Sequence, residues 1–194
     1  MAAEQLADVD FARFVIDGFP EVVTPWASAA ADLSAVWFEE TIPKPAIVAP
    51  AVPVERLTSS AQWALGADGD KALDRLTHTT QRAVYDGARE TTLLNVERNN
   101  IRWARDARPD ACSFCRMLAT RTDQYLYRSR DTAAAKTHDD CHCIPIEVAD
   151  PDDYELPDHV QAWQDEYEKA RANAGTGETK NILSAWRAQQ PEYR

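Results

Sequence analysis

Glycine is scarce in this chain of 194 residues, with only six copies. None of them belongs to a Gly-x-Ser-x-Gly elbow, a Gly-x-Gly-x-x-Gly fingerprint or a Walker A loop. The sequence also has no Ser/His/Asp order typical of a catalytic triad. Most familiar templates for nucleotide binding and hydrolysis are therefore excluded, and we expect a protein that is not an enzyme.

Basic residues are few as well. The chain has 32 acidic and 21 basic residues, a net charge of −11, which argues against a general nucleic-acid coat protein. The charge is uneven, with a net +4 over residues 99–137 and a net −10 over residues 139–169. This pattern is typical of solvated faces that complement each other, or of a basic window that touches an acidic surface or a phosphate backbone. We expect at most weak, salt-sensitive contact with DNA.

Long apolar runs are missing. No stretch approaches the length that spans a membrane, and the acidic first ten residues lack the basic and apolar regions of a signal peptide. We therefore expect a protein that is made in the cytoplasm and has no membrane contact.

The apolar spacing predicts a mainly α-helical fold with a small zinc-stapled α+β module near the C-terminus. Pro20 is expected to separate two helices in the first segment, because proline breaks the helical hydrogen-bond ladder. Gly66 and Gly69 are expected to interrupt the helical segment 54–98. The five predicted segments are an N-terminal helical arm (1–42), a Pro-rich spacer (43–53), a helical body (54–98), the zinc-binding module (99–150), and an acidic loop with C-terminal helices at 158–173 and 178–189 (151–194).

Three short segments with strand-like alternation lie around the cysteines. They are residues 101–105, 124–128 and 144–148, and Pro145 favours an edge position for the last of them. We expect these small strands to frame the module.

All four cysteines fall in one window as two close pairs. Cys112-x-x-Cys115 is followed, after 22 residues, by His138-x-x-Cys141-His142-Cys143. In a reducing compartment this spacing favours a metal over disulfides, and Zn²⁺ prefers four tetrahedral sulfur or nitrogen ligands. Cys112, Cys115 and Cys141 are the first expected ligands. The fourth is Cys143 or His138, while His142 points away if Cys141 and Cys143 share a face.

A site with four protein ligands leaves no open coordination position, so the expected zinc is structural. It would staple a loop of about thirty residues that has little core of its own. Buried free thiols or two local disulfides are the alternatives, although a Cys-x-Cys disulfide would be strained.

Two other functions remain open from the residues alone. His138, Asp139, Asp140 and His142 beside the cysteines could belong to a metal-dependent nuclease of the His-Asn-His type, but histidines interleaved with ligands leave a general base little freedom. A zinc-ribbon adaptor that binds other proteins is the second alternative.

The stretch from Ile101-Arg-Trp through Cys112-Ser-Phe-Cys115 to His138-Asp-Asp-Cys141-His-Cys143-Ile-Pro-Ile resembles the C-terminal motif of Mu gpF-like (MuF) minor head proteins of tailed bacteriophages. The tail, from Tyr167-Glu-Lys-Ala-Arg171 to Ile182-Leu-Ser-Ala-Trp-Arg187, looks like the ending of versions from phages of actinobacteria. The resemblance covers residues 99–190, about half of the chain. Residues 1–98 match only in being helical.

The resemblance implies a minor capsid protein located in the virion, in the capsid interior or at the portal vertex. Its implied partners are the portal protein, the major capsid protein or both, with several copies in a head. Its implied role is to assist head assembly, DNA packaging or ejection.

The N-terminal arm carries a short aromatic stripe that includes Phe11, Phe14, Val15, Trp26, Leu33 and Trp37. Such a stripe is typical of a helix that docks in an apolar groove of another protein. We therefore expect the arm to bind the portal or the capsid shell.

Overall fold

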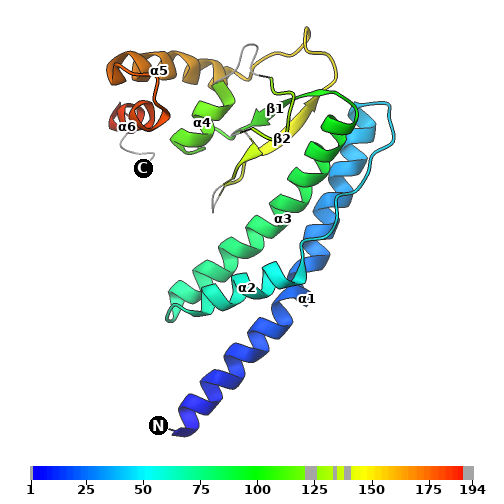
Figure 1. Ribbon diagram of the computed structural model, residues 1–194, viewed down its shortest axis with the longest axis vertical. Coiled ribbons are helices and arrows are strands. Elements are labelled where there is room, and N and C mark those ends of the chain that lie inside the picture. Colours follow the sequence, from blue (N-terminus) through cyan, green and yellow to red (C-terminus); the bar gives the residue numbers. More distant parts are fainter. Residues whose placement is uncertain (1, 121–125, 133–134, 138–140, 190–194) are drawn as a thin grey trace. The chain divides into compact units, whose positions relative to one another are not determined.

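The computed structural model describes residues 2–120, 126–132, 135–137 and 141–189. The chain divides into two compact units, residues 1–91 and 92–194, which are described separately. The expected class, mainly helical with a small α+β module, is confirmed (Figure 1). The elements are α1 (Ala2–Thr41), α2 (Val54–Leu65), α3 (Asp70–Arg98), β1 (Arg102–Asp106), α4 (Ser113–Thr120), β2 (Ile144–Val148), α5 (Asp158–Ala174) and α6 (Thr179–Gln189).

Helix α1 is continuous over 40 residues, so the expected break at Pro20 is wrong. Pro20 and Pro25 both lie inside the helix, where each proline costs about 3 kcal/mol or more. The free-energy cost of the prolines is offset by a row of buried residues at nearly every fourth position, which packs in part against α2 and α3. The row consists of Phe19, Val23, Ala27, Ala31, Ala35, Phe38 and Ile42. Tertiary packing therefore overrides the local preference of proline.

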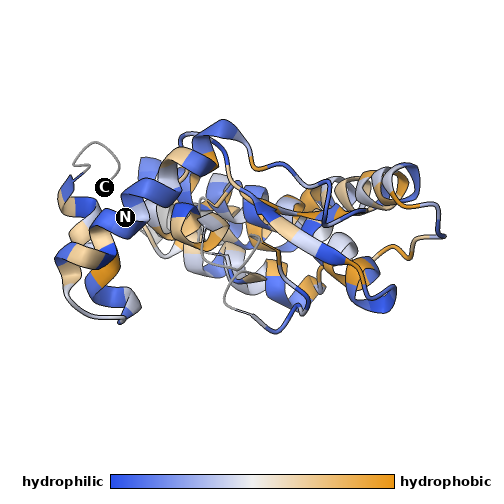
Figure 2. Cartoon of the chain, turned by 90° about the horizontal axis from the view of Figure 1, so that it is seen from above, coloured by the Kyte–Doolittle hydropathy of each residue, from blue (hydrophilic) through white to orange (hydrophobic). Residues whose placement is uncertain are grey.

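Helices α2 and α3 complete the first unit. They are separated at Gly66–Gly69, as expected, and Gly69 takes a left-handed backbone conformation with φ of 51°. Leu57 and Ala61 of α2 share one core cluster with Val23 of α1 and Ala83 of α3. Figure 2 shows hydrophobic and hydrophilic positions mixed along the helices, as expected for elements with one buried side.

The Pro-rich segment 43–53 is not helical, and α2 begins directly after it at residue 54. The amide of Ala49 donates a buried hydrogen bond of 3.1 Å to Oγ1 of Thr91, and the amide of Ala46 donates to Glu39. The segment is thereby tied to α1 and α3. The expected segment boundaries at residues 42 and 53 both fall inside the first unit.

The end of α3 leads directly into β1. Asn100 has a φ of 53°, and the amides of Asn100 and Ile101 donate to the carbonyls of Glu97 and Val96. This is a Schellman ending in which asparagine takes the left-handed position that glycine usually fills. It satisfies carbonyls that the helix would otherwise leave without partners.

Strands β1 and β2 pair antiparallel, with Trp103 opposite Glu147 and Arg105 opposite Pro145. The expected strands at 101–105 and 144–148 are thus confirmed to within one residue. Of the expected strand at 124–128, residues 124 and 125 lie outside the described residues, while Tyr127 forms a single bridge with Trp103 and stacks on its ring at 4.7 Å.

Helices α4, α5 and α6 form the main core of the second unit. The two C-terminal helices lie close to their expected bounds, and Gly175 ends α5 with a φ of 62°. The core includes Met117, Leu118, Val160, Trp163, Ile182 and Trp186, together with Cys115, Cys141 and Cys143. The cysteines are therefore part of the apolar core of this unit.

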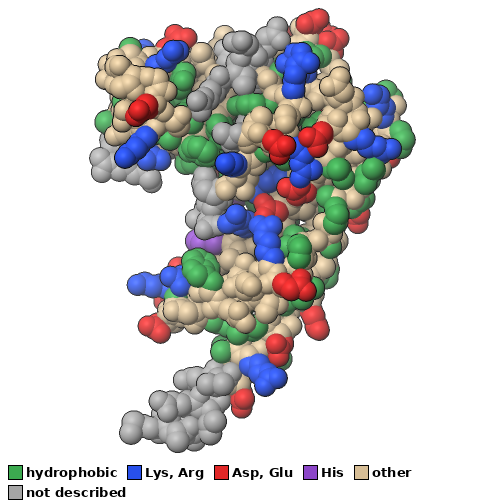
Figure 3. Space-filling view, viewed as in Figure 1, with side chains coloured by type: hydrophobic (Ala, Val, Ile, Leu, Met, Phe, Trp, Pro, Cys, Tyr) green, Lys and Arg blue, Asp and Glu red, His purple; other side chains and the backbone are tan. Residues whose placement is uncertain are grey.

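The tryptophans divide into two groups. Trp103, Trp163 and Trp186 are buried, whereas Trp26, Trp37 and Trp63 each expose more than half of their surface. Figure 3 shows hydrophobic side chains at the surface among acidic and basic ones on the face it displays. In the part of the chain that the structure describes, no helix combines the length and apolar character needed to cross a bilayer.

Candidate metal centre

Three buried cysteines meet in the second unit. The sulfur atoms of Cys115, Cys141 and Cys143 all lie within 4.8 Å of one another, and those of Cys115 and Cys141 are 3.6 Å apart. Sulfurs around one tetrahedral zinc ion lie about 3.8 Å apart, because each Zn–S bond is about 2.3 Å. The cluster therefore has the dimensions of a metal site with at least three thiolate ligands.

Helix α4 positions the first cysteine pair. The helix begins at Ser113, so Cys115 lies in its first turn and Cys112 immediately precedes it. The amide of Arg116 donates to the carbonyl of Cys112 at 3.0 Å. No helix was predicted here, although Phe114, Met117 and Leu118 have the i, i+3, i+4 spacing of one.

The second cysteine pair lies immediately before β2. Cys141 and Cys143 are both buried and both join the cluster, whereas His142 between them is half-buried. Cys141 and Cys143 thus lie on the same side of the chain, toward Cys115. Within the part of the chain that the structure describes, Cys115, Cys141 and Cys143 are the potential metal ligands that lie close to one another.

The complete set of four ligands stays a prediction. Cys112, one of the first expected ligands, is half-buried and is not among the three sulfurs that lie within 4.8 Å of one another, whereas Cys143, an alternative for the fourth position, is. His138 lies outside the described residues, and so do Asp139 and Asp140 of the nuclease alternative.

Arg105 of β1 points its guanidinium at the cluster. Its side chain is buried, with 5% of the residue exposed, and its Nη2 donates to Sγ of Cys141 at 3.2 Å and to Sγ of Cys115 at 3.4 Å. Its Nη1 donates to the carbonyl of Lys136 at 3.2 Å. From the sequence, Arg105 was expected only as a residue of the strand 101–105 and of the basic window 99–137. The signal for its position was the period-two spacing with Trp103, which puts both side chains on one face of β1, although Ala104 on the other face is buried as well.

The pKa values of the cluster thiols shift in opposite directions. Hydrogen bonding with Cys115 lowers the pKa of Cys141 well below the usual thiol range, and the Arg105 charge acts in the same direction. Hydrogen bonding with Cys112 and then with Cys141 raises the pKa of Cys115. Burial alone would lower the pKa of Arg105, but the charge of Cys115 raises it above its ordinary value.

A second arginine fixes the loop that carries Cys112. The Arg116 side chain is buried, and it donates from Nε to the carbonyl of Ala111 at 2.7 Å and from Nη2 to that of Pro109 at 3.0 Å. Its guanidinium also lies 4.9 Å from the centre of the Trp163 ring. These contacts hold the approach to α4 in one conformation.

The start of α4 is also bound to the last helix. Nε of Arg187 in α6 donates to Oγ of Ser113 at 3.0 Å. Ser113, one of the two residues between the cysteines of the first pair, therefore links α4 to α6, and the centre is supported from α5 and α6 as well as from the sheet.

The donor set fits a zinc ion. None of the four described cysteines forms a disulfide, three sulfurs converge in an apolar core, and a cation already faces them. Thiolates are soft ligands that select Zn²⁺ over hard ions such as Mg²⁺. When bound, zinc would be held by Cys115, Cys141 and Cys143 with a fourth ligand, and it would link the start of α4 to the start of β2.

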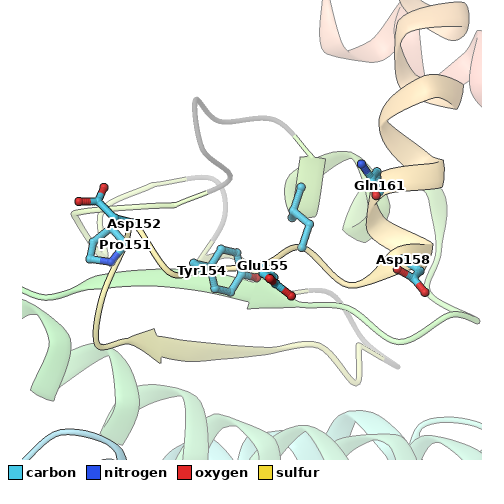
Figure 4. Close-up of a pocket in the computed structure, with 7 residues that line it drawn as sticks. Pro151, Asp152, Tyr154, Glu155, Asp158 and Gln161 are labelled. Carbon is cyan, nitrogen blue, oxygen red and sulfur yellow. The ribbon is translucent and has the colours of Figure 1, made fainter.

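An acidic hollow of about 560 Å³ lies elsewhere in the second unit. Tyr154, Asp158 and Gln161 are among the residues that line it, with Asp152 and Glu155 as further carboxylates (Figure 4). Burial, with the nearby charge of Asp106, raises the pKa of Tyr154. The hollow agrees with the expected acidic character of residues 139–169.

A model of the VG15 protein family matches residues 2–170 of this chain. The match covers most of the sequence, including α1 and all four cysteines. Neither the curated proteins nor the solved structures contain a match. The chain therefore belongs to the VG15 protein family, a family of viral proteins.

Proposed function

We propose that this chain is a structural minor head protein of a tailed bacteriophage, of the MuF type, located in the capsid interior or at the portal vertex. Membership of a viral family over residues 2–170 supports a viral role, and the cysteine module resembles that of MuF proteins. The observation that carries a structural, docking role is an exposed apolar face on α1.

This face, here called the outer stripe, lies on the side of α1 away from the buried row. Each of its members exposes more than half of its surface. They are Phe11, Phe14, Val22, Trp26, Leu33, Val36 and Trp37. Large exposed apolar patches mark sites of protein interaction, and regular spacing along one helix suits a groove on a partner.

The charge of α1 indicates the chemistry of the partner. The helix contains eight acidic residues and a single basic one, Arg13, which pairs with Asp17 at 3.7 Å. Exposed carboxylates of Glu21, Asp32 and Glu39 follow one flank of the outer stripe. The matching surface is an apolar groove with a basic rim, since charges of opposite sign speed docking and fix its register. We assign this groove to the portal or the major capsid protein.

The zinc centre supplies the second part of the proposed role. It lies in the core of the second unit, where binding energy becomes folding energy. A stapled module of this kind suits a protein that must keep its shape inside a head. The packaged genome is a further, weak contact for the basic side chains of residues 99–137.

Quantitative mass spectrometry of purified phage heads tests the proposal. The chain should be retained in washed, intact particles at a fixed ratio to the portal protein. Its absence from such particles, with abundant protein in the infected-cell lysate, would contradict a virion location.

A further inference from the structure

We propose that Arg105 is the charge-balancing residue of the metal centre, holding the thiolates of its two halves together and increasing the affinity for Zn²⁺. This inference rests on the zinc-binding part of the proposed function. It gives a buried side chain on β1 a role that neither the cysteine spacing nor the family match assigns.

The first observation is the bridging geometry. One nitrogen, Nη2, donates both to Cys115 on α4 and to Cys141 before β2, at 3.4 and 3.2 Å. Cys115 belongs to the first cysteine pair and Cys141 to the second, and these two residues are 26 positions apart in the chain. The guanidinium therefore contacts both halves of the site that the ion would join.

The second observation is the charge of the donor set. Zn²⁺ with four thiolates carries a net charge of −2, and with three thiolates and one neutral histidine it carries −1. Either centre is unfavourable in an apolar core without compensation. Arg105 is itself buried, and a buried guanidinium also requires an anionic partner. Each charge therefore compensates for the burial of the other.

The third observation is the choice of side chain. A guanidinium has five N–H donors in a fixed plane, so it can donate to two sulfurs while Nη1 binds the carbonyl of Lys136. A lysine ammonium at the same position would retain the charge but could not reproduce this planar arrangement. Arg105→Lys is therefore expected to restore part of the function.

The test uses the full chain with three substitutions. Arg105→Met removes the charge and keeps an unbranched apolar side chain, Arg105→Lys keeps the charge, and Arg102→Met on the same strand is the control, because alternation places Arg102 on the other face of β1. Zinc affinity is measured by competition with a chromogenic chelator. Co²⁺ loading provides an independent readout through the thiolate-to-metal charge-transfer band.

Loss of a residue that supports metal ligands typically lowers metal affinity by about 10- to 100-fold. We expect a loss in this range for Arg105→Met, a smaller loss for Arg105→Lys and no change for Arg102→Met. The Co²⁺ charge-transfer band should shift in both Arg105 variants, which a purely structural role for the side chain would not produce.

Zinc affinity and a Co²⁺ band that are unchanged in Arg105→Met would overturn the inference. If that variant does not fold, Arg105→Lys with wild-type affinity and spectrum would overturn it equally. Wild-type protein that binds neither metal would refute the centre itself. None of these outcomes bears on the presence of the chain in heads, so failure of the inference is distinct from failure of the virion assignment.

Discussion

Gly87 of α3 lies directly against the backbone carbonyl of Ala27 in α1. A Cβ atom added at position 87 would overlap that carbonyl oxygen, and the nearby positions Ala31 and Ala83 are also small and buried. The two helices therefore approach so closely that only hydrogen fits between their backbones. This contact lies in the first unit and helps to hold the proline-containing part of α1 in place.

Gly87→Ala should destabilise the protein. Overpacking against a backbone atom costs about 1–3 kcal/mol, and the better helix propensity of alanine offsets at most about 1 kcal/mol. Urea unfolding followed by circular dichroism measures the difference. Gly18→Ala is the matched control, since nothing lies within 4 Å of a Cβ there and the change should stabilise α1 by about 0.5–1 kcal/mol. A stabilised Gly87→Ala variant would contradict the close approach.

Cys141→Ser should release zinc and lower the stability of the second unit sharply. The serine hydroxyl is a poor zinc ligand, and the loss of binding energy is a loss of folding energy. Elemental analysis of freshly purified protein should give one equivalent of zinc for the wild type and for His142→Ala, and little for Cys141→Ser. Less than half an equivalent in the unchelated wild type would count decisively against the centre.

Arg116→Met should destabilise the second unit and weaken zinc binding. The substitution leaves the buried carbonyl of Ala111 without this donor, at about 1–3 kcal/mol, and also removes the hydrogen bond to Pro109 and the contact with Trp163. Thermal unfolding and zinc retention measure both effects. Arg108→Met is the control, because its ion pair with Asp110 is exposed and contributes about 0–1 kcal/mol. Equal stability of the two variants would show that the Arg116 contacts contribute little.

The double substitution Trp26→Ser/Trp37→Ser should prevent incorporation into heads and leave folding intact. Both side chains are exposed, at 66% and 61%, so they contribute little to the core but much to the outer stripe. A phage carrying the double variant tests this when its heads are examined by mass spectrometry. Leu73→Ser changes an equally exposed apolar residue of α3 outside the stripe and should be incorporated normally. Normal incorporation of the double variant would exclude the stripe as the docking face.

Linear DNA incubated with the purified protein and Mg²⁺ or Mn²⁺ should stay intact. A zinc ion whose four positions are all occupied by protein ligands has no site for an attacking water. Gel electrophoresis over a time course measures cleavage. Metal-dependent nicking that co-purifies with the protein, and that Cys141→Ser retains, would instead favour the nuclease alternative.

The elements with strong local signals could be predicted from the sequence. The strands near 101–105 and 144–148, the break at Gly66–Gly69 and the two C-terminal helices follow from side-chain periodicity and from glycine, which act within a few residues. The prediction of a helix break at Pro20 was wrong for the same reason. The local preference of proline is strong, while the packing of Val23 and Ala27 against other helices cannot be seen from the neighbouring residues in the sequence. The cysteine spacing predicted a cluster, but it gave no indication that Arg105 faces it.

The sequence alone determined that this is a mainly helical chain with paired cysteines between two short strands, since periodicity and motif spacing are properties of neighbouring residues. Only the tertiary structure decided that α1 is unbroken and that Arg105 donates hydrogen bonds to the sulfurs of Cys115 and Cys141. Both outcomes depend on burial and charge compensation between distant segments, which exist only once the chain has folded.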